Sequence, residues 1–468
     1  MPNINPMAVI EDIVLPDAVR NILATAKIQF DVQPAAAINP AQRLYSTLLQ
    51  HHSKQLLVVL PHTHILNLNT LNSATQAAWQ PLPFTSTQHL LSQYALQTLP
   101  PLPALFAQSC LCDPAVFTHN TVYFESGIAG QLIALKTTDL TQLLGISKKI
   151  SCAEPISQVQ PNHCAMSSDL EQIKSAVTRL TTRRIHQRLE QTLEVPVLNK
   201  TSKQVLRLYN NPESNVDELT AIVETDPALA AQVISWAASP YYAAPSKVRS
   251  VEDAIVRVLG FDLVLSLALG LSLKKSLNIP RQQPRNATPY WQKAIYTAAL
   301  IEGLTRAMPA DKKPESGLAY LAGLLHNFGF ALLAHVFPPH YTLVCQALDA
   351  NLHLKHSVVE HHLLGVTREQ MGAWLMQYWN IPQELVYAVR FQDKPDYQGQ
   401  HASYANLNCL AQSLLAQHGI GCPPHDTHIP ESLYLCLGLT AEQAQKAVQQ
   451  VLQAELALQR LTQQFSQP

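Results

Sequence analysis

The sequence is poor in charge, and this scarcity sets the first limit on its function. Charged side chains make up 14% of the 468 residues, and the 32 basic side chains nearly cancel the 33 acidic ones. A chain that binds nucleic acid or an anionic membrane through its overall charge would carry a clear basic excess. The composition therefore gives no reason to expect either partner.

Cysteines are few, and none is spaced as a metal-binding motif requires. The eight cysteines are scattered, and the closest pair, Cys110 and Cys112, lacks the second pair that a structural zinc site needs. We expect reduced thiols and no zinc.

Segments typical of export or membrane insertion are also lacking. The opening "MPNINPMAVIEDIVLP" contains no basic residue and no long apolar core. The longest apolar stretch identified, Leu263 to Leu273, is shorter than the roughly 18 residues that cross a bilayer. We therefore expect a cytoplasmic protein without a membrane partner.

What is present indicates a multidomain protein, because this length accommodates about two to three domains of ~150 residues each. The first third alternates β-rich runs with amphipathic stretches, such as Asp17–Ala26 and Thr85–Gln97, that have helical spacing. These patterns predict an α+β domain over residues 1–145. The β-rich runs are Lys27–Val32, Gln55–Pro61, His64–Leu68, Thr121–Ser126 and Gln131–Lys136.

Beyond residue 145 the sequence loses periodicity and then becomes helical. Residues 146–180 have the polar composition of a linker, and residues 181–420 predict an all-α domain. Its helix starts carry recognisable caps: Asp226 before Pro227, Ser250, and Thr367 with Gln370. Residues 421–468 predict a helical extension, with one long helix from Thr440, capped with Gln443, to about Gln464.

Several motifs in this helical region resemble the HDOD domain, a bacterial signalling module related to HD-type metal phosphohydrolases. The resemblance spans about Arg188 to Lys394, nearly half of the chain. The motifs are the Asp226-Pro227 helix start, the Ser239 to Tyr242 turn, the Ser250 helix ending in Leu-Gly, "YLAGLLHNFG", Glu360, Gly365, Gly372 and Tyr378 to Pro382.

The resemblance implies a metal site that this sequence has altered. In catalytic HD relatives an earlier histidine, a His-Asp doublet and a later aspartate hold a metal that activates water. Here the doublet is His326-Asn327, the earlier position falls at or near Lys293, and a later histidine pair of many members is Phe391-Gln392. Asparagine is a poor ligand and lysine repels a metal, so we expect a hydrogen-bonded polar pair, no catalytic residue, no metal and no cofactor.

A second group of histidines invites the same question. Six lie within a short stretch, but no His-Glu-x-x-His pattern occurs among them, and we expect solvated surface histidines near a loop. They are His335, His340, His353, His356, His361 and His362.

The first third resembles the YbaK and prolyl-tRNA-editing fold over about Leu15 to Gly145. The most specific part of the match is the closing strand, glycine-containing turn, strand and Asp139 helix. Catalytic members trim misacylated tRNA with a lysine just before the first long central strand, and Pro40 to Gln50 contains Arg43 but no lysine. A pocket would involve Arg43, Lys54, Gly127 and Gly130, with turn formation as the simpler role of both glycines.

One basic patch could meet a partner. Residues 271 to 313 hold eight basic and two acidic side chains, and Lys274, Lys275, Arg281 and Arg285 begin the run. The same run is also explained by a solvated surface. No aromatic residues are interleaved as single-strand binding requires, so tRNA is the weaker partner.

Together these patterns predict a non-enzymatic bacterial signalling or regulatory protein. Its partner would be a signalling protein, or a small-molecule or nucleotide ligand, and the oligomeric state stays open. Two alternatives remain: aminoacyl-tRNA deacylation by the first domain, and metal-dependent phosphohydrolysis by the helical domain.

Overall fold

The chain folds into two compact units, each described here by itself. The computed structural model describes residues 15–106, 109–159, 166–181, 195–243, 247–276, 283–284, 287–395, 397–421 and 429–466. The first unit consists of Met1–Gln160 together with Gln346–Leu354. The second consists of Pro161–Cys345 and Lys355–Pro468.

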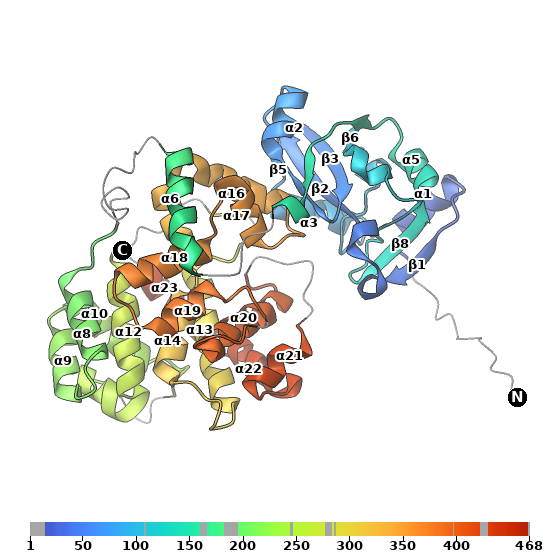
Figure 1. The fold of residues 1–468 in the computed structure, drawn as a ribbon. Helices are drawn as coiled ribbons and strands as arrows, with labels where there is room; N and C mark the ends of the chain where they lie inside the picture. The colour runs from blue at the N-terminus through green and yellow to red at the C-terminus, as the bar shows by residue number, and fades with distance from the viewer. Residues whose placement is uncertain are drawn as a thin grey trace, which may run out of the picture. The chain divides into compact units, whose positions relative to one another are not determined.

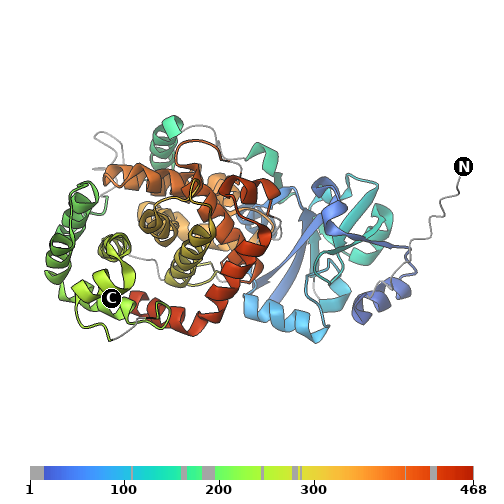
Figure 2. The same ribbon diagram turned by 90° about the horizontal axis from the view of Figure 1, so that it is seen from below.

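The first unit is built on mixed β-structure, as the α+β prediction required. Its largest sheet has the strand order β5-β2-β3-β6-β9, in which β2 and β3 form an antiparallel hairpin and β3 and β6 run parallel. A second sheet has the order β1-β8-β7, and β4 pairs with β10 (Figures 1 and 2). The strands are β1 (Asp31–Pro34), β2 (Leu44–His51), β3 (Lys54–Pro61), β4 (His64–Leu66), β5 (Gln80–Pro81), β6 (Ser109–Cys112), β7 (Thr121–Glu125), β8 (Gln131–Lys136), β9 (Lys148–Lys149) and β10 (Ala153–Pro155).

Alternating residues of the central hairpin enter two different cores. Leu57 and Val59 of β3 pack into one hydrophobic cluster, whereas Val58 and Leu60 pack into another. Because both faces of this strand are covered, its sequence is a continuous apolar run instead of an alternating one. The helices of this unit are α1 (Asp17–Thr25), α2 (Leu68–Thr75), α3 (Phe84–Gln93), α4 (Pro103–Phe106) and α5 (Thr137–Leu144).

A distant segment completes the second of these cores. Ala350 belongs to the same cluster as Val58 and Leu60 and is fully buried. Next to it, the Asn351 amide accepts a hydrogen bond from the Leu66 backbone N–H at 2.7 Å and donates one to the Leu66 carbonyl at 3.2 Å. Asn351 therefore pairs with β4 as a neighbouring strand would.

Residues 146–180, which have the composition of a linker, contain regular structure. Strands β9 and β10 pair within the first unit, and helix α6 (Asp169–Leu180) belongs to the second. The α6 helix is anchored at its first residue: the buried Asp169 carboxylate accepts hydrogen bonds from Arg390 and Gln370, each at 2.8 Å.

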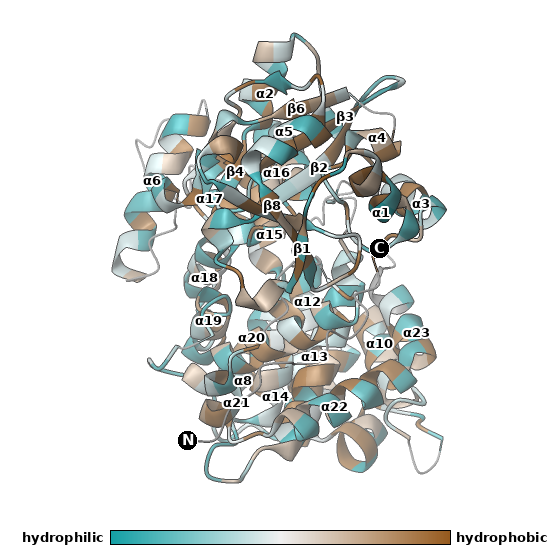
Figure 3. Cartoon of the chain, turned by 90° about the vertical axis from the view of Figure 1, so that its right-hand side faces the viewer, coloured by the Kyte–Doolittle hydropathy of each residue, from teal (hydrophilic) through white to brown (hydrophobic). Residues whose placement is uncertain are grey.

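The second unit is all-α in its described residues. Helices α8, α9 and α10 pack side by side and against α12 at one end of the unit (Figure 1), and α13 lies between α14, α20 and the C-terminal helices. Figure 3 shows apolar colouring along much of α13, in agreement with the burial of most of its residues. The helices are α8 (Lys200–Tyr209), α9 (Val216–Glu224), α10 (Pro227–Ala237), α11 (Val251–Asp253), a π-helical turn (Ala254–Leu259), α12 (Phe261–Lys274), α13 (Tyr290–Ala307), α14 (Ser316–Leu325), α15 (Phe328–Val336), α16 (Pro338–Ala350, whose last turn belongs to the first unit), α17 (His356–Leu364), α18 (Arg368–Tyr378), α19 (Gln383–Arg390), α20 (Ala402–Gln417), α21 (Glu431–Leu437), α22 (Ala441–Gln453) and α23 (Glu455–Ser466).

The helix caps are where the sequence placed them. Asp226 and Ser250 accept N-terminal backbone hydrogen bonds of α10 and α11, and full capping boxes are present at Thr367 and Thr440. The long helix predicted from Thr440 is wrong, since α22 ends at Gln453 and α23 begins at Glu455. No glycine or proline marks the break between α22 and α23. Both helices are amphipathic, so the hydrophobic periodicity of the sequence predicted one continuous helix.

The expectation that no apolar stretch reaches membrane-spanning length is wrong, because one stretch of the described chain is long enough by length and composition. It covers Ser316–Val336, and 94% of its most apolar window is buried inside the protein.

Candidate functional site

The His326-Asn327 doublet forms the turn between α14 and α15 and is buried. His326 is 2% exposed, and its Nδ1 donates a hydrogen bond to the Gly323 carbonyl at 2.7 Å. Its other ring nitrogen, Nε2, has no hydrogen-bond partner among the described residues. Burial lowers the pKa of His326 well below its usual value, and the nearby charges of Lys293 and Arg368 lower it further. The imidazole is therefore neutral at physiological pH.

Asn327 faces a buried ion pair that the sequence did not reveal. Its side-chain oxygen accepts a hydrogen bond from Arg368 Nη1 at 3.1 Å, and Arg368 Nε donates to Glu360 Oε1 at 2.6 Å. The Arg368 backbone N–H also donates to Glu360 Oε2 at 2.9 Å, and its guanidinium lies 4.2 Å from the centre of the Phe330 ring. Glu360 is fully buried, so the two charges compensate each other away from water.

Two glycines hold this ion pair against the doublet. A Cβ on Gly329 would lie 1.7 Å from the Arg368 carbonyl oxygen, and one on Gly372 would lie 3.1 Å from the Gly329 nitrogen. The absence of both side chains lets α15 and α18 cross at backbone contact. This crossing brings Arg368, from the N-terminus of α18, onto Asn327.

A chain of amides connects Lys293 to the same turn. Lys293 Nζ donates to Gln412 Oε1 at 3.1 Å, Gln412 Nε2 donates to Gln392 Oε1 at 2.9 Å, and Gln392 Nε2 donates to the His326 carbonyl at 2.9 Å. The structure thus brings together Lys293, the doublet and Gln392, which the sequence analysis had grouped. The structure adds Gln412, which the sequence analysis did not identify. In a sequence, a glutamine on a long helix that faces a buried site looks the same as a glutamine that faces solvent.

The other histidines are not all solvated. His353 is 8% exposed, stacks on Tyr45 with ring centroids 3.7 Å apart, and has its Nε2 within 2.9 Å of the His64 carbonyl. His356 Nε2 lies 2.7 Å from Glu369 Oε1. Burial alone would raise the pKa of Glu369. The charge and hydrogen bond of His356, together with the charge of Arg368, outweigh burial and lower this pKa to about 2. The expectation of surface histidines is therefore wrong for His353, because residues of β2 and β4, which are distant in sequence, cover it.

The candidate residues of the first unit are spread apart. Arg43 precedes β2, and its guanidinium lies 3.8 Å from the carboxylate of Glu125 on β7. Lys54 starts β3 at the opposite end of the β2–β3 hairpin, where its register partner is His51. Burial raises the pKa of Glu125, and Arg43 opposes this rise.

The two glycines differ in their surroundings. The backbone of Gly127 has a φ of +95°, which favours glycine there, and a Cβ would also lie 2.5 Å from the end of the Leu96 side chain, which can move. Gly130 also has positive φ, at +80°, but no atom lies within 4 Å of a Cβ built on it.

The basic patch is only partly visible. Lys275 forms an ion pair with Asp226, and burial lowers the pKa of the half-buried Lys274. Arg281 and Arg285 lie outside the described residues.

Comparisons with known proteins agree with both resemblances. Residues 195–395 match the HDOD domain family, and residues 30–143 match the aminoacyl-tRNA editing domain family. A provisionally assigned signal transduction protein from Marinobacter aquaeolei VT8 is 36% identical, with a TM-score of 0.90, over 97% of this chain and 100% of that one.

Two further relatives are more distant. An HDOD domain protein of unknown function from Geobacter sulfurreducens shares the fold, at 16% identity and a TM-score of 0.50, over 63% of this chain and 99% of that one. An uncharacterized protein from Treponema pallidum (strain Nichols) is 22% identical over 264 residues, which is 56% of this chain. This match spans 49% of the Treponema protein, so the chain covers about half the length of that curated relative.

Proposed function

The chain belongs to the HDOD-domain proteins that carry an N-terminal aminoacyl-tRNA editing domain, and on this basis we propose that it is a cytoplasmic bacterial regulatory protein that acts by binding and not by hydrolysis. Its ligand would be a signalling protein, or a small molecule or nucleotide. A signal would be transmitted by a shift between packings of the two modules.

The observation that carries this proposal is the Arg368–Glu360 ion pair beside the HD-like doublet. The residues there do not fit a divalent metal ion, because the side-chain oxygen of Asn327 already accepts a hydrogen bond from the guanidinium of Arg368. The ammonium of Lys293 adds a second positive charge near His326. Among the described residues, no group of three or more histidine, cysteine, aspartate or glutamate side chains is placed to hold a metal. Activation of water by a metal is therefore not part of the proposed function.

Metal analysis of the purified full-length protein tests the proposal. We expect well below one manganese, iron or zinc ion per chain, and the same content in His326→Ala. The variant Asn327→Asp, which restores the carboxylate of the catalytic relatives, is expected to stay metal-poor, because Arg368 would pair with the new charge. Stoichiometric metal that is lost in His326→Ala, together with hydrolysis of a phosphodiester substrate, would overturn the proposal.

The editing reaction needs its own assay. We expect no turnover of mischarged tRNA, because Arg43 is paired with Glu125 and Lys54 lies at the far end of the hairpin. Turnover that disappears in Lys54→Ala or Arg43→Ala would assign the deacylase function instead.

A further inference from the structure

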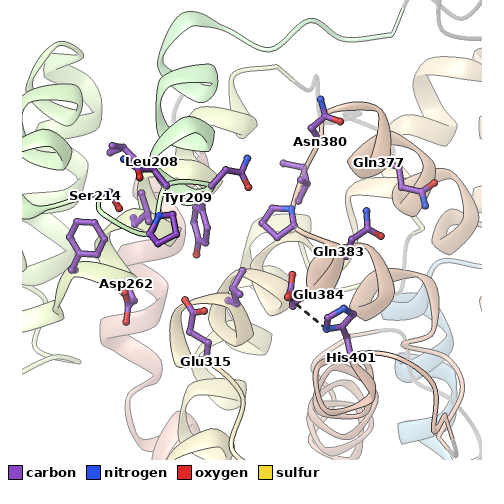
Figure 4. A pocket seen from close by; sticks show the side chains of 18 residues that line it. Leu208, Tyr209, Ser214, Asp262, Glu315, Gln377, Asn380, Gln383, Glu384 and His401 are labelled. Carbon is purple, nitrogen blue, oxygen red and sulfur yellow. Dashed lines mark ion pairs between the residues drawn. The ribbon is translucent and has the colours of Figure 1, made fainter.

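Acidic residues stand at the starts of several helices in the helical unit, and Asp169 differs from the others in its burial. Asp262 in the first turn of α12 and Glu315 just before α14 are exposed beside an open depression (Figure 4). The helix dipole alone accounts for a negative charge at such positions. Asp169, the first residue of α6, is only 6% exposed, so its charge needs a partner within the protein.

The partner of Asp169 is Arg390, the last residue of α19. Arg390 Nη2 donates to Asp169 Oδ1 at 2.8 Å, and Arg390 Nε donates to the second carboxylate oxygen. Arg390 is 4% exposed, and Asp169 supplies the one carboxylate that pairs with it in the described part of the chain. Undocking of α6 would leave a buried guanidinium without its carboxylate. Because such a state is strongly unfavourable, the helix is either docked or fully released.

Gln370 makes the second polar contact with the first residue of α6. Its Nε2 donates to Asp169 Oδ1 at 2.8 Å, and its Oε1 accepts the Thr367 backbone N–H at 3.0 Å as part of the capping box of α18. One side chain thus joins α6 to the start of α18, and Figure 1 shows the two helices side by side. Ile173 and Val177, both fully buried, form the apolar face of α6.

The last turn of α6 is tied to the ends of two other helices. Arg179 Nη2 donates to the Leu364 carbonyl at 2.9 Å, at the end of α17. A Cβ on the next residue, Gly365, would lie 2.8 Å from the same nitrogen, so the guanidinium lies close to the space that a side chain would fill. The Leu180 carbonyl lies 3.0 Å from His340 Nε2 on α16. Helix α6 is therefore held at both ends.

Three of the segments that α6 contacts also supply residues to the polar network around the HD-like doublet. Helix α17 supplies Glu360, α18 supplies Arg368, and the turn after α19 supplies Gln392. The contacts of α6 are close to them in sequence, because Gln370 follows Arg368 by two residues and Arg390 precedes Gln392 by two. Helix α6 itself precedes the residues 195–395 that match the HDOD family.

We propose that α6 is a releasable clamp on the HD-like doublet. Docked, it holds α17, α18 and α19 in the arrangement in which Arg368 and Gln392 contact the doublet. When Asp169 leaves Arg390, that arrangement loosens. The inference rests on the proposed function, because it names the element through which a shift in packing reaches the doublet.

Amide hydrogen exchange of the full-length protein tests the clamp. Asp169→Asn removes the charge of the side chain and keeps its size. We expect the amides of α6 to exchange about tenfold faster or more, and the amides of Phe330 and Arg368, which donate hydrogen bonds beside the doublet, to speed up by a similar factor. The Leu219 amide, which donates a hydrogen bond in the first turn of α9, should keep its wild-type rate.

Glu171→Gln is the matched control. It also removes a negative charge from the first turn of α6, but Glu171 is exposed and pairs with Lys174 on the same helix. We expect wild-type exchange at Phe330 and Arg368 in this variant. Acceleration of α6 alone in Asp169→Asn, equal acceleration of Leu219, or the same acceleration in both variants would each overturn the clamp.

The wild-type protein gives a second test that does not depend on a variant that folds. As urea is raised below the concentration of global unfolding, the amides of α6 and of Arg368 should converge on one exchange rate, as amides that open together do. Separate rates throughout would overturn the clamp. The two proposals fail separately, because stoichiometric metal would overturn the role without hydrolysis, whereas uncoupled exchange would overturn the clamp alone.

Discussion

The guanidinium of Arg368 is in direct contact with the His326-Asn327 doublet, and its acceptors come from two other segments. Glu360 lies 8 residues earlier, but Asn327 lies 41 residues away. In the sequence, Arg368 directly follows the capping residue Thr367, and a charged residue in the first turn of a helix is usually expected to face solvent. The motif predicted that His326, Asn327 and Lys293 share a site, whereas the identity of the group that contacts Asn327 depends on a helix crossing that no local pattern contains.

Arg368→Met tests the strength of this buried pair. Because the change leaves the Glu360 carboxylate buried without its cation, we expect the free energy of unfolding to fall by about 3–5 kcal/mol. Urea denaturation followed by circular dichroism measures the loss. The control Arg257→Met breaks an exposed ion pair with Asp253 and should leave the free energy of unfolding almost unchanged, because water screens that pair. Equal losses in the two variants would show that the buried pair contributes no special stability.

The pH dependence of stability tests Glu369. Its folded-state pKa of about 2 lies below the ordinary value of 4.5, so the unfolded state takes up the proton first. The stabilisation is therefore complete above about pH 5 and is lost as the pH falls from 4.5 towards 2. We expect Glu369→Gln to be less stable than wild type at pH 5, where the Glu369 carboxylate is ionised, and this gap to narrow at pH 3. A gap of constant size across that range would contradict the lowered pKa.

Among the elements, α15 and α18 cross so closely that the described backbone leaves no room for a side chain at Gly329. The sequence predicted capped helices well, because Thr367 with Gln370 and Thr440 with Gln443 are signals within one turn. It missed strand β2, whose residues enter the same two cores as those of β3, because Ser46 and Thr47 interrupt its apolar run. Helix crossings are likewise absent from periodicity, and here only the glycines of the doublet motif and of α18 indicate one.

Gly329→Ala tests this crossing. A Cβ would lie 1.7 Å from the backbone oxygen of Arg368, and because that atom is backbone it cannot move without shifting α18. We expect a loss of about 3 kcal/mol or more in the free energy of unfolding. Gly303→Ala is the matched control in α13, where the nearest atom would be 3.4 Å away. Its helix propensity should make it neutral or stabilising by up to about 1 kcal/mol, and a comparable loss in both variants would contradict the close approach.

At the scale of the whole molecule, the boundary between the units is not a single point in the sequence. The composition placed it at the polar stretch after residue 145, because linkers and domains differ in periodicity. The chain nevertheless passes between the units three times, since Gln346–Leu354 returns to the first unit. A segment of this kind leaves no compositional trace, because it consists of the end of an ordinary helix and a short loop.

This return makes a prediction about the first unit on its own. A fragment of residues 15–160 lacks Asn351 and Ala350, so the Leu66 backbone groups lose their partners and one core loses a buried side chain. An unsatisfied buried group costs about 1–3 kcal/mol, so we expect the fragment to unfold at lower urea concentration than the first unit within the full chain. Asn351→Ala in the full chain should reproduce part of that loss, and it should speed amide exchange at Leu66. If the fragment and the full chain protect Leu66 equally, then the returning segment does not stabilise the first unit, and a single cut after residue 160 separates two self-sufficient domains.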